Sequence, residues 1–197
     1  MRKDLVLPSF QSSFLSCEKD TELILRKLFI ESQPHSDILK RLLVINTKDC
    51  LTNKESELYN NIIKDMSLKK LYDKGYIRLS PKIKFPEHED IKSYILMTFD
   101  NFTTCQTNPQ FRDCIVSFDI ICHTDYWDIG DFQVRPLKIA GYIDGILNNC
   151  KLTGIGTFQF LGCSEIILNE DMSGYTLMYA AVHGSDDRIE ELPDGTR

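Results

Sequence analysis

The sequence predicts an α+β protein in which an N-terminal helical segment is followed by a ββαββ sheet with helices packed on one face. Between residues 20 and 75, apolar residues recur with the spacing of amphipathic helices. From residue 91 onwards they alternate along the chain, which indicates strands with one buried face, and a helical stretch interrupts them after Pro136. Two pairs of strands joined by a helix form an antiparallel or mixed sheet, and helices cover its apolar face.

The composition is that of a soluble single-domain protein. The chain has 197 residues, 42% of them hydrophobic, and a net charge of −6. This length and apolar content are enough for one proper core. The negative charge argues against a protein whose whole surface binds nucleic acid. No apolar run approaches the roughly 20 residues of a membrane span, and the first ten residues lack a signal peptide's apolar region, so we expect no membrane association.

The seven cysteines are odd in number and include no CxxC pair. Several of them fall within apolar strand patterns. Buried free thiols in a reducing cytosol explain this distribution better than disulfides or a zinc site.

We divide the chain into four parts on these patterns. An N-terminal arm covers residues 1–19 and a helical segment covers residues 20–90. The α+β core covers residues 91–183, and an acidic tail, expected to be mobile unless a partner orders it, covers residues 184–197.

Capping residues predict where the early helices begin and end. Asp20 is the expected N-cap of the first helix, because its carboxylate can accept unpaired N–H groups of the first turn. Pro34 is expected to end that helix, and Ser36 or Asp37 to begin the next. The pattern Thr-Asn-Lys-Glu at residues 52–55 is a capping box and predicts the start of a further helix.

Gly75 is expected to stop the last of these helices, and residues 76–90 to form a connector with one short extended piece. The core then reads as a strand after residue 91, a loop over 102–110, a strand over 112–123, an aromatic-bearing loop over 124–134, a helix opened by Pro136, a strand from Phe158 towards Leu168, a connection over 169–174 and a final strand from Tyr175.

The predicted sheet carries apolar residues on both faces. Ile115 and Ile121 lie on the otherwise polar side of the 112–123 strand, and the final strand has Met178 and Val182 on its second side. A sheet covered only on one face would not expose so much apolar surface on the other. We therefore expect the N-terminal segment, another subunit, or both to cover it.

A cluster of titratable residues lies between the middle strand and the helix. His123, Asp125, Asp128 and Asp131 could hold a divalent cation or relay a proton. Their spacing matches no ligand template, however, and Asp and Gly are common turn formers. The paired glycines of residues 153–157 precede a strand rather than a helix, which excludes a phosphate loop. We therefore expect no cofactor, metal or catalytic residues.

The same loop is the predicted partner interface, because large aromatic side chains beside charges are favoured at protein contacts. The residues expected to form this interface are Tyr126, Trp127, Asp128, Phe132 and Arg135.

Three stretches of the C-terminal half carry a family resemblance. The first has Phe118-Asp119-Ile120 followed by His123, the second has Arg135 ahead of Ile139, Ile143, Asp144 and Leu147, and the third has Leu177, Tyr179, Val182 and His183. In this order they resemble tail-terminator, tail-completion and related neck proteins of tailed bacteriophages.

The resemblance implies a structural virion protein without a catalytic centre, in which α+β subunits form a homo-oligomeric ring at the head–tail junction. Its partners would be other phage neck, connector or tail-tube proteins, and DNA would only pass through the channel. An acidic lumen, suggested by the net charge of −6, would let DNA slide by like-charge repulsion. Such a subunit would be made in the bacterial host cytoplasm. The helical segment is longer than a minimal tail terminator requires, so terminator, stopper and other connector layers stay open.

Two other functions remain open from the residues alone. One is a metal-dependent hydrolase that uses His123, Asp125 and Asp128. The other is a small regulatory domain that binds a protein partner.

Overall fold

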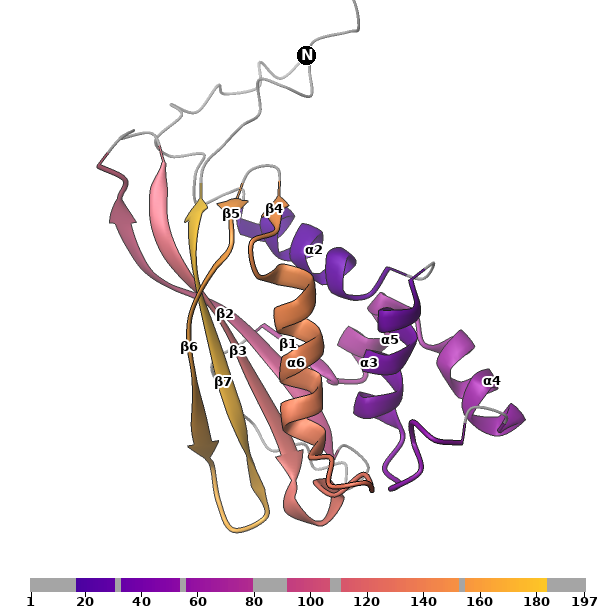
Figure 1. Cartoon of the computed structure of the whole chain (residues 1–197). Coiled ribbons are helices and arrows are strands. Elements are labelled where there is room, and N and C mark those ends of the chain that lie inside the picture. The colour runs from indigo at the N-terminus through magenta and orange to yellow at the C-terminus, as the bar shows by residue number, and fades with distance from the viewer. Residues whose placement is uncertain are drawn as a thin grey trace, which may run out of the picture.

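The computed structural model describes residues 17–30, 33–53, 56–79, 92–106, 111–152 and 155–183. They form a five-stranded mixed sheet of order β1-β2-β3-β7-β6, and the helices lie on one face of it (Figure 1). The predicted α+β class is confirmed. The strands are β1 (Ile77–Arg78), β2 (Ser93–Thr104), β3 (Arg112–His123), β6 (Gln159–Ile167) and β7 (Met172–His183), with β4 (Lys151–Leu152) and β5 (Gly156–Thr157) as a separate ribbon. The helices are α2 (Cys17–Leu28), α3 (Pro34–Val44), α4 (Glu57–Asp65), α5 (Leu68–Asp73) and α6 (Arg135–Leu147), with a 3-10 turn η1 (Thr124–Tyr126).

Two early helix starts differ from the prediction. Helix α2 begins at Cys17, so Asp20 lies in its first turn, buried, and is not the N-cap. A carboxylate is favourable in a first turn as well as at the cap, so residue type alone could not fix the position. Helix α3 begins at Pro34, which was expected to end the preceding helix. Proline suits the first helical turn because the N–H it lacks would have no partner there.

The capping box expected at residues 52–55 is also wrong. The hydroxyl of Thr52 donates to the carbonyl of Asp49 at 3.4 Å. Helix α4 starts later, where the hydroxyl of Ser56 accepts the N–H of Tyr59 at 3.3 Å. The stop after α5 is confirmed, because Gly75 has a φ of +83°.

Strand β3 is the centre of the sheet and pairs antiparallel with β2 on one side and β7 on the other. Its residue Phe118 lies opposite Met97 and Leu177, and all three are buried in the core. The strand bounds differ from the prediction at β2, which runs to Thr104 inside the loop expected over 102–110, and at β7, which begins at Met172 inside the connection expected over 169–174. β7 can begin before Tyr175 because residue 174 is a glycine. The backbone there passes so close to β3 that a Cβ would lie 1.7 Å from the carbonyl oxygen of Ile120.

The core lies between the sheet and the helices. Ile139, Ile143 and Leu147 of α6 are fully buried and face β3 and β7, as the predicted stripe requires. Full burial of each such side chain contributes roughly 1.5–3 kcal/mol. Among the described helices, none is long and apolar enough to cross a membrane.

Helix α6 leaves the edge of the sheet uncovered. With side chains, a helix is about 10–12 Å wide and neighbouring strands are about 4.7–4.9 Å apart, so one helix covers about two strands. In Figure 1, β6 lies beyond α6, and its residues Phe160, Leu161 and Ile167 are 44, 53 and 70% exposed.

The second face of the sheet carries no helix from the described part of the chain (Figure 1). Tyr94, Ile121 and Met172 are nevertheless buried there, packed with Ile166 and Leu168. The described helices of the N-terminal segment, which was one of the covers expected for this face, lie instead on the opposite face beside α6.

Candidate interaction site

The loop between β3 and α6, residues 124–134, is folded as a compact turn. It starts with η1 and closes through a bridge between Asp128 and Val134. Within that bridge, the N–H of Ile129 donates to the carbonyl of Gln133 at 3.1 Å, and the N–H of Gln133 donates to the carbonyl of Gly130 at 2.9 Å. Because Ile129 is also buried, the β3–α6 loop is anchored at its base.

The tip of the β3–α6 loop presents Phe132 to solvent. Its relative exposure is 106%, so the ring contacts almost nothing in its own chain. Gly130, Asp131 and Phe132 have φ values of +83°, +51° and +59°, which puts three successive residues in the left-handed region. For a bulky L-residue this conformation costs about 1–2 kcal/mol. The backbone therefore holds an aromatic side chain outward at an energetic cost.

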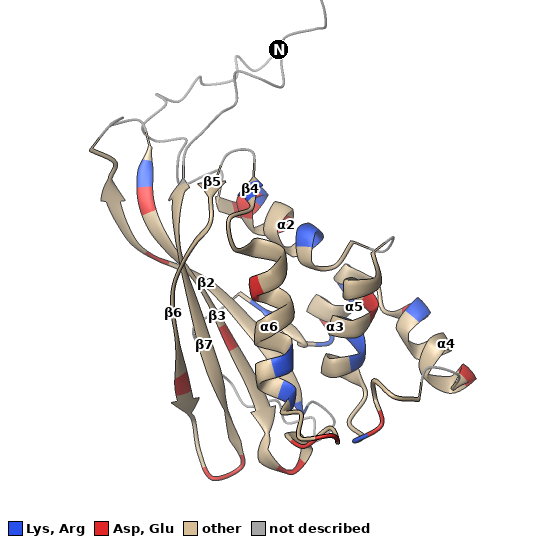
Figure 2. Ribbon diagram, viewed as in Figure 1, with Lys and Arg blue, Asp and Glu red and all other residues tan. Residues whose placement is uncertain are grey.

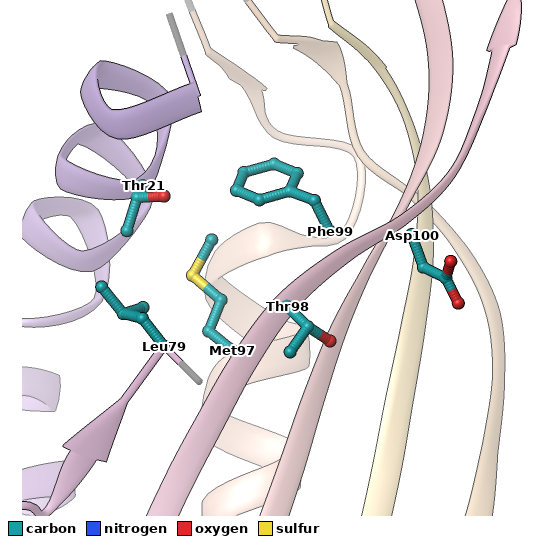
Figure 3. Close-up of a pocket in the computed structure, with 6 residues that line it drawn as sticks. All are labelled: Thr21, Leu79, Met97, Thr98, Phe99 and Asp100. Carbon is teal, nitrogen blue, oxygen red and sulfur yellow. The ribbon is translucent and has the colours of Figure 1, made fainter. Parts of the chain in front are cut away.

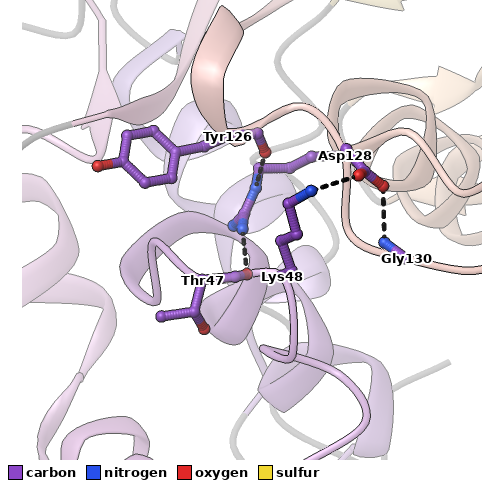
Figure 4. Close-up of polar contacts among 6 residues, drawn as sticks. Thr47, Lys48, Tyr126, Asp128 and Gly130 are labelled. Atoms are coloured by element: carbon purple, nitrogen blue, oxygen red, sulfur yellow. Dashed lines mark hydrogen bonds and ion pairs between the residues drawn. The ribbon is translucent and has the colours of Figure 1, made fainter.

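Asp128 braces the tip from one side. Its carboxylate accepts the N–H of Gly130 at 2.9 Å and pairs with the ammonium of Lys48 at 2.7 Å, as Figure 4 shows. The hydrogen bond from Lys48, followed by that from Gly130, lowers the pKa of the Asp128 carboxyl. Lys48 was not anticipated from the sequence, since no local pattern links residues 80 positions apart.

Arg135 fixes the loop from beneath. The side chain is fully buried, and its Nε donates to the carbonyl of Tyr126 at 2.7 Å. Its Nη atoms donate to three carbonyls at and just beyond the C-terminal end of α3, and Figure 4 shows the one that belongs to Thr47. These acceptors are Leu42 at 2.5 Å, Ile45 at 2.9 Å and Thr47 at 2.8 Å. A cation at a helix C-terminus also interacts favourably with the helix dipole. Arg135 therefore supports the loop from within the chain.

Tyr126 and Trp127 pack largely on their own chain. The indole N–H of Trp127 donates to the carbonyl of Cys122 at 3.2 Å, and its ring lies 6.2 Å from that of Tyr175. The rings of Tyr126 and His123 form a T-shaped pair with their centroids 5.7 Å apart. The predicted interface residues are thus gathered in one place, but of the five only Asp128 and Phe132 are exposed.

Exposed carboxylates surround the loop. The β6–β7 turn lies beside it, because the N–H of Thr124 donates to the carbonyl of Asp171 at 2.8 Å. Figure 2 shows acidic residues gathered at this end of the molecule. The exposed acidic residues of the two loops are Asp125, Asp128, Asp131, Glu170 and Asp171.

The same carboxylates do not assemble into a metal centre. Nδ1 of His123 accepts the N–H of Asp125 at 3.3 Å and lies 3.6 Å from the Asp125 carboxylate, whereas Asp128 is turned towards Lys48. In the ranges that the structure describes, no group of three or more His, Cys, Asp and Glu could hold a metal ion. This arrangement gives the metal-dependent hydrolase no support.

A model of the YomW family matches residues 36–181, which run from α3 through the β3–α6 loop into β7. The chain belongs to the YomW family. A solved structure titled "Virion of native gene transfer agent (GTA) particle" is similar to this YomW protein with a TM-score of 0.38 and 15% sequence identity, over 67% of this chain and 95% of that chain. No curated protein matches the sequence.

The YomW match includes the β3–α6 loop and the residues near the end of α3 that contact it. The matched range covers Lys48, the carbonyls that accept hydrogen bonds from Arg135, and the whole of the loop. The helical segment from α3 onwards is thus part of the family's common chain rather than an addition to the sheet.

Proposed function

We propose that this YomW protein is a structural virion protein that forms an oligomeric ring at the phage head–tail junction, as a tail terminator or another neck layer. The ring holds head and tail together around the DNA channel and performs no catalysis. The observation that carries the proposal is the fully exposed Phe132 on a braced, left-handed turn.

The loop has the features of a preorganised docking element. Aromatic side chains dominate the energetics of protein interfaces, and a rigid element loses little conformational entropy on binding. Asp128 and Arg135 hold the loop in place before any partner arrives. The strained backbone is best explained by a contact that Phe132 makes outside its own chain.

The surroundings of Phe132 define the partner. The exposed carboxylates beside it favour a surface rich in Lys and Arg, because complementary charges fix the register of a contact and exclude wrong partners. We therefore expect the adjoining neck or tail layer to offer an apolar pocket with a basic rim. The net charge of −6 suits a ring through which DNA passes without binding.

Replacement of Phe132 by Ala tests the proposal in phage particles assembled by complementation. We expect this variant to give separate heads and tails in electron micrographs and a loss of at least tenfold in infectious titre. The matched control is Leu58→Ala, which removes a 66% exposed apolar side chain from α4 and should assemble normally. Normal joining of heads to tails by the Phe132 variant would overturn the proposal.

A further inference from the structure

Exposed side chains of β6 form a shelf beside α6. Phe160 lies opposite Tyr179 of β7, and Cys163 lies opposite Leu177, so both point to the face of the sheet that the helices cover. Ile167 lies on the same face, because it is four residues after Cys163 along the strand. Phe160, Cys163 and Ile167 are nevertheless exposed, since α6 does not reach over them.

One flank of α6 is the wall of this shelf. The Asp144 carboxylate accepts the hydroxyl of Tyr179 at 2.9 Å, so this flank faces β7. Leu137 lies on the same flank two turns earlier and is 46% exposed. A Cβ at Gly141 would meet nothing within 4 Å, which leaves room for an incoming side chain against the helix backbone. We call this surface the α6–β6 shelf and define it as Leu137, Gly141, Phe160, Cys163 and Ile167.

The α6–β6 shelf is acidic as well as apolar. Glu165 is exposed between Cys163 and Ile167 and lies on their face of the strand. Residues 159–183, which form β6, β7 and their turn, include no Lys or Arg. An exposed apolar patch beside carboxylates favours a partner that offers an apolar side chain surrounded by positive charge.

Helix α5 offers such a surface at the opposite end of the sheet. It packs on β1, whereas β6 is at the other end of the strand order, and Figure 1 shows α5 and β6 on opposite sides of α6. Tyr72 of α5 is 50% exposed. Residues 64–74 carry four Lys against two Asp, and one of these, Asp65, is already paired with Lys70. The exposed lysines closest to Tyr72 in the sequence are Lys69, Lys70 and Lys74.

We propose that α5 of one copy docks on the α6–β6 shelf of a second copy, with Tyr72 on its apolar floor and the α5 lysines beside Glu165. Tyrosine is a frequent anchor of protein interfaces. Lysine stems also cover apolar surface while their ammonium groups reach carboxylates. Because the two surfaces lie at opposite ends of the strand order, repeated contacts run head to tail and can close into a ring. The inference rests on the proposed ring and names the surfaces that join its subunits.

Cross-linking in assembled particles tests the contact. Cys163 is an exposed thiol on the shelf, and Lys69→Cys would place a second thiol one helical turn from Tyr72. We expect a short bismaleimide to convert this variant into a ladder of covalent multimers that extends beyond the dimer. The ladder should be absent from wild-type protein and from the double variant Lys69→Cys with Cys163→Ser.

Asp100→Cys is the matched control for position. Asp100 is exposed, and Figure 3 shows its side chain pointing away from those of Met97 and Phe99, which point towards α2. A thiol at residue 100 therefore lies on the other face of the sheet and should give no ladder with Cys163.

Other outcomes overturn the inference. Monomers alone from Lys69→Cys would show that α5 does not lie on the shelf of a neighbour, and dimers alone would indicate a two-fold contact between copies. A ladder that persists in the Cys163→Ser variant, or one that Asp100→Cys also gives, would place the contact elsewhere. Because the assay reads contacts between copies, its failure is distinct from that of the docking proposal, which Phe132→Ala tests through the joining of heads to tails.

Discussion

Replacement of Arg135 by Met should destabilise the protein by about 3 kcal/mol. Methionine keeps much of the aliphatic volume but removes all the donors. The carbonyls of Leu42 and Ile45, whose contacts with Arg135 are buried, then lose a charged partner. Each unsatisfied buried acceptor costs about 1–3 kcal/mol, and relief from burying the guanidinium charge offsets part of the sum. The Tyr126 and Thr47 carbonyls are partly exposed, and water can replace their bonds.

Urea unfolding followed by tryptophan fluorescence measures this loss directly. Trp127 is the single tryptophan of the chain, and it lies in the loop that Arg135 supports. For a protein of this size, about 3 kcal/mol corresponds to a fall in Tm of roughly 6–12 °C.

Two further variants bracket the result. Arg26→Met removes an exposed arginine and should change the unfolding free energy by less than about 0.5 kcal/mol. Arg135→Lys keeps the charge but cannot reproduce the planar set of donors, so it should fall between wild type and Arg135→Met. If Arg135→Met matched Arg26→Met within error, the four carbonyl contacts would not hold the loop as described.

A pair of Phe132 variants and the reactivity of two cysteines test the strain of the loop tip and the burial of β3. Phe132→Gly should be more stable to urea than Phe132→Ala by up to about 1.5 kcal/mol, because glycine relieves about 1–2 kcal/mol of left-handed strain and gives back about 0.4–1 kcal/mol in unfolded-state entropy. An alanine variant that is more stable than the glycine variant would remove the evidence for strain. Burial raises the pKa of the Cys122 thiol to about 11, so at pH 8 this thiol should resist maleimide in the native protein and react only after unfolding, whereas Cys163 should react at once, as mass spectrometry of the labelled protein can show. Rapid native labelling of Cys122 would contradict its burial.

The order of elements in the core was accessible from the sequence because periodicity is a local property. The alternation of Val116, Phe118 and Ile120 has the two-residue period of a strand, which indicates β3. The spacing of Ile139 and Ile143 matches one turn of a helix, which indicates α6. Helix starts were less accessible. Ser56 and the residues at 52–55 offer similar capping chemistry, and packing of α4 against α3 contributes to the choice between them.

The loop at residues 124–134 was located from its aromatic and turn-forming residues, but the sequence could not tell which residues support the loop and which face solvent. Arg135 and Phe132 both looked available to a partner. Arg135 is buried and donates hydrogen bonds to carbonyls some ninety positions away, whereas the side chain of Phe132 contacts almost nothing in its own chain.

The sequence by itself determined the α+β class, the central strand and the helix that follows it, because these depend on residues close together along the chain. Only the tertiary structure decided that Lys48 and the end of α3 brace the loop, and that α6 leaves β6 bare. Those outcomes depend on which distant segments meet and on the width of a helix relative to the spacing of strands, and neither is written in local periodicity.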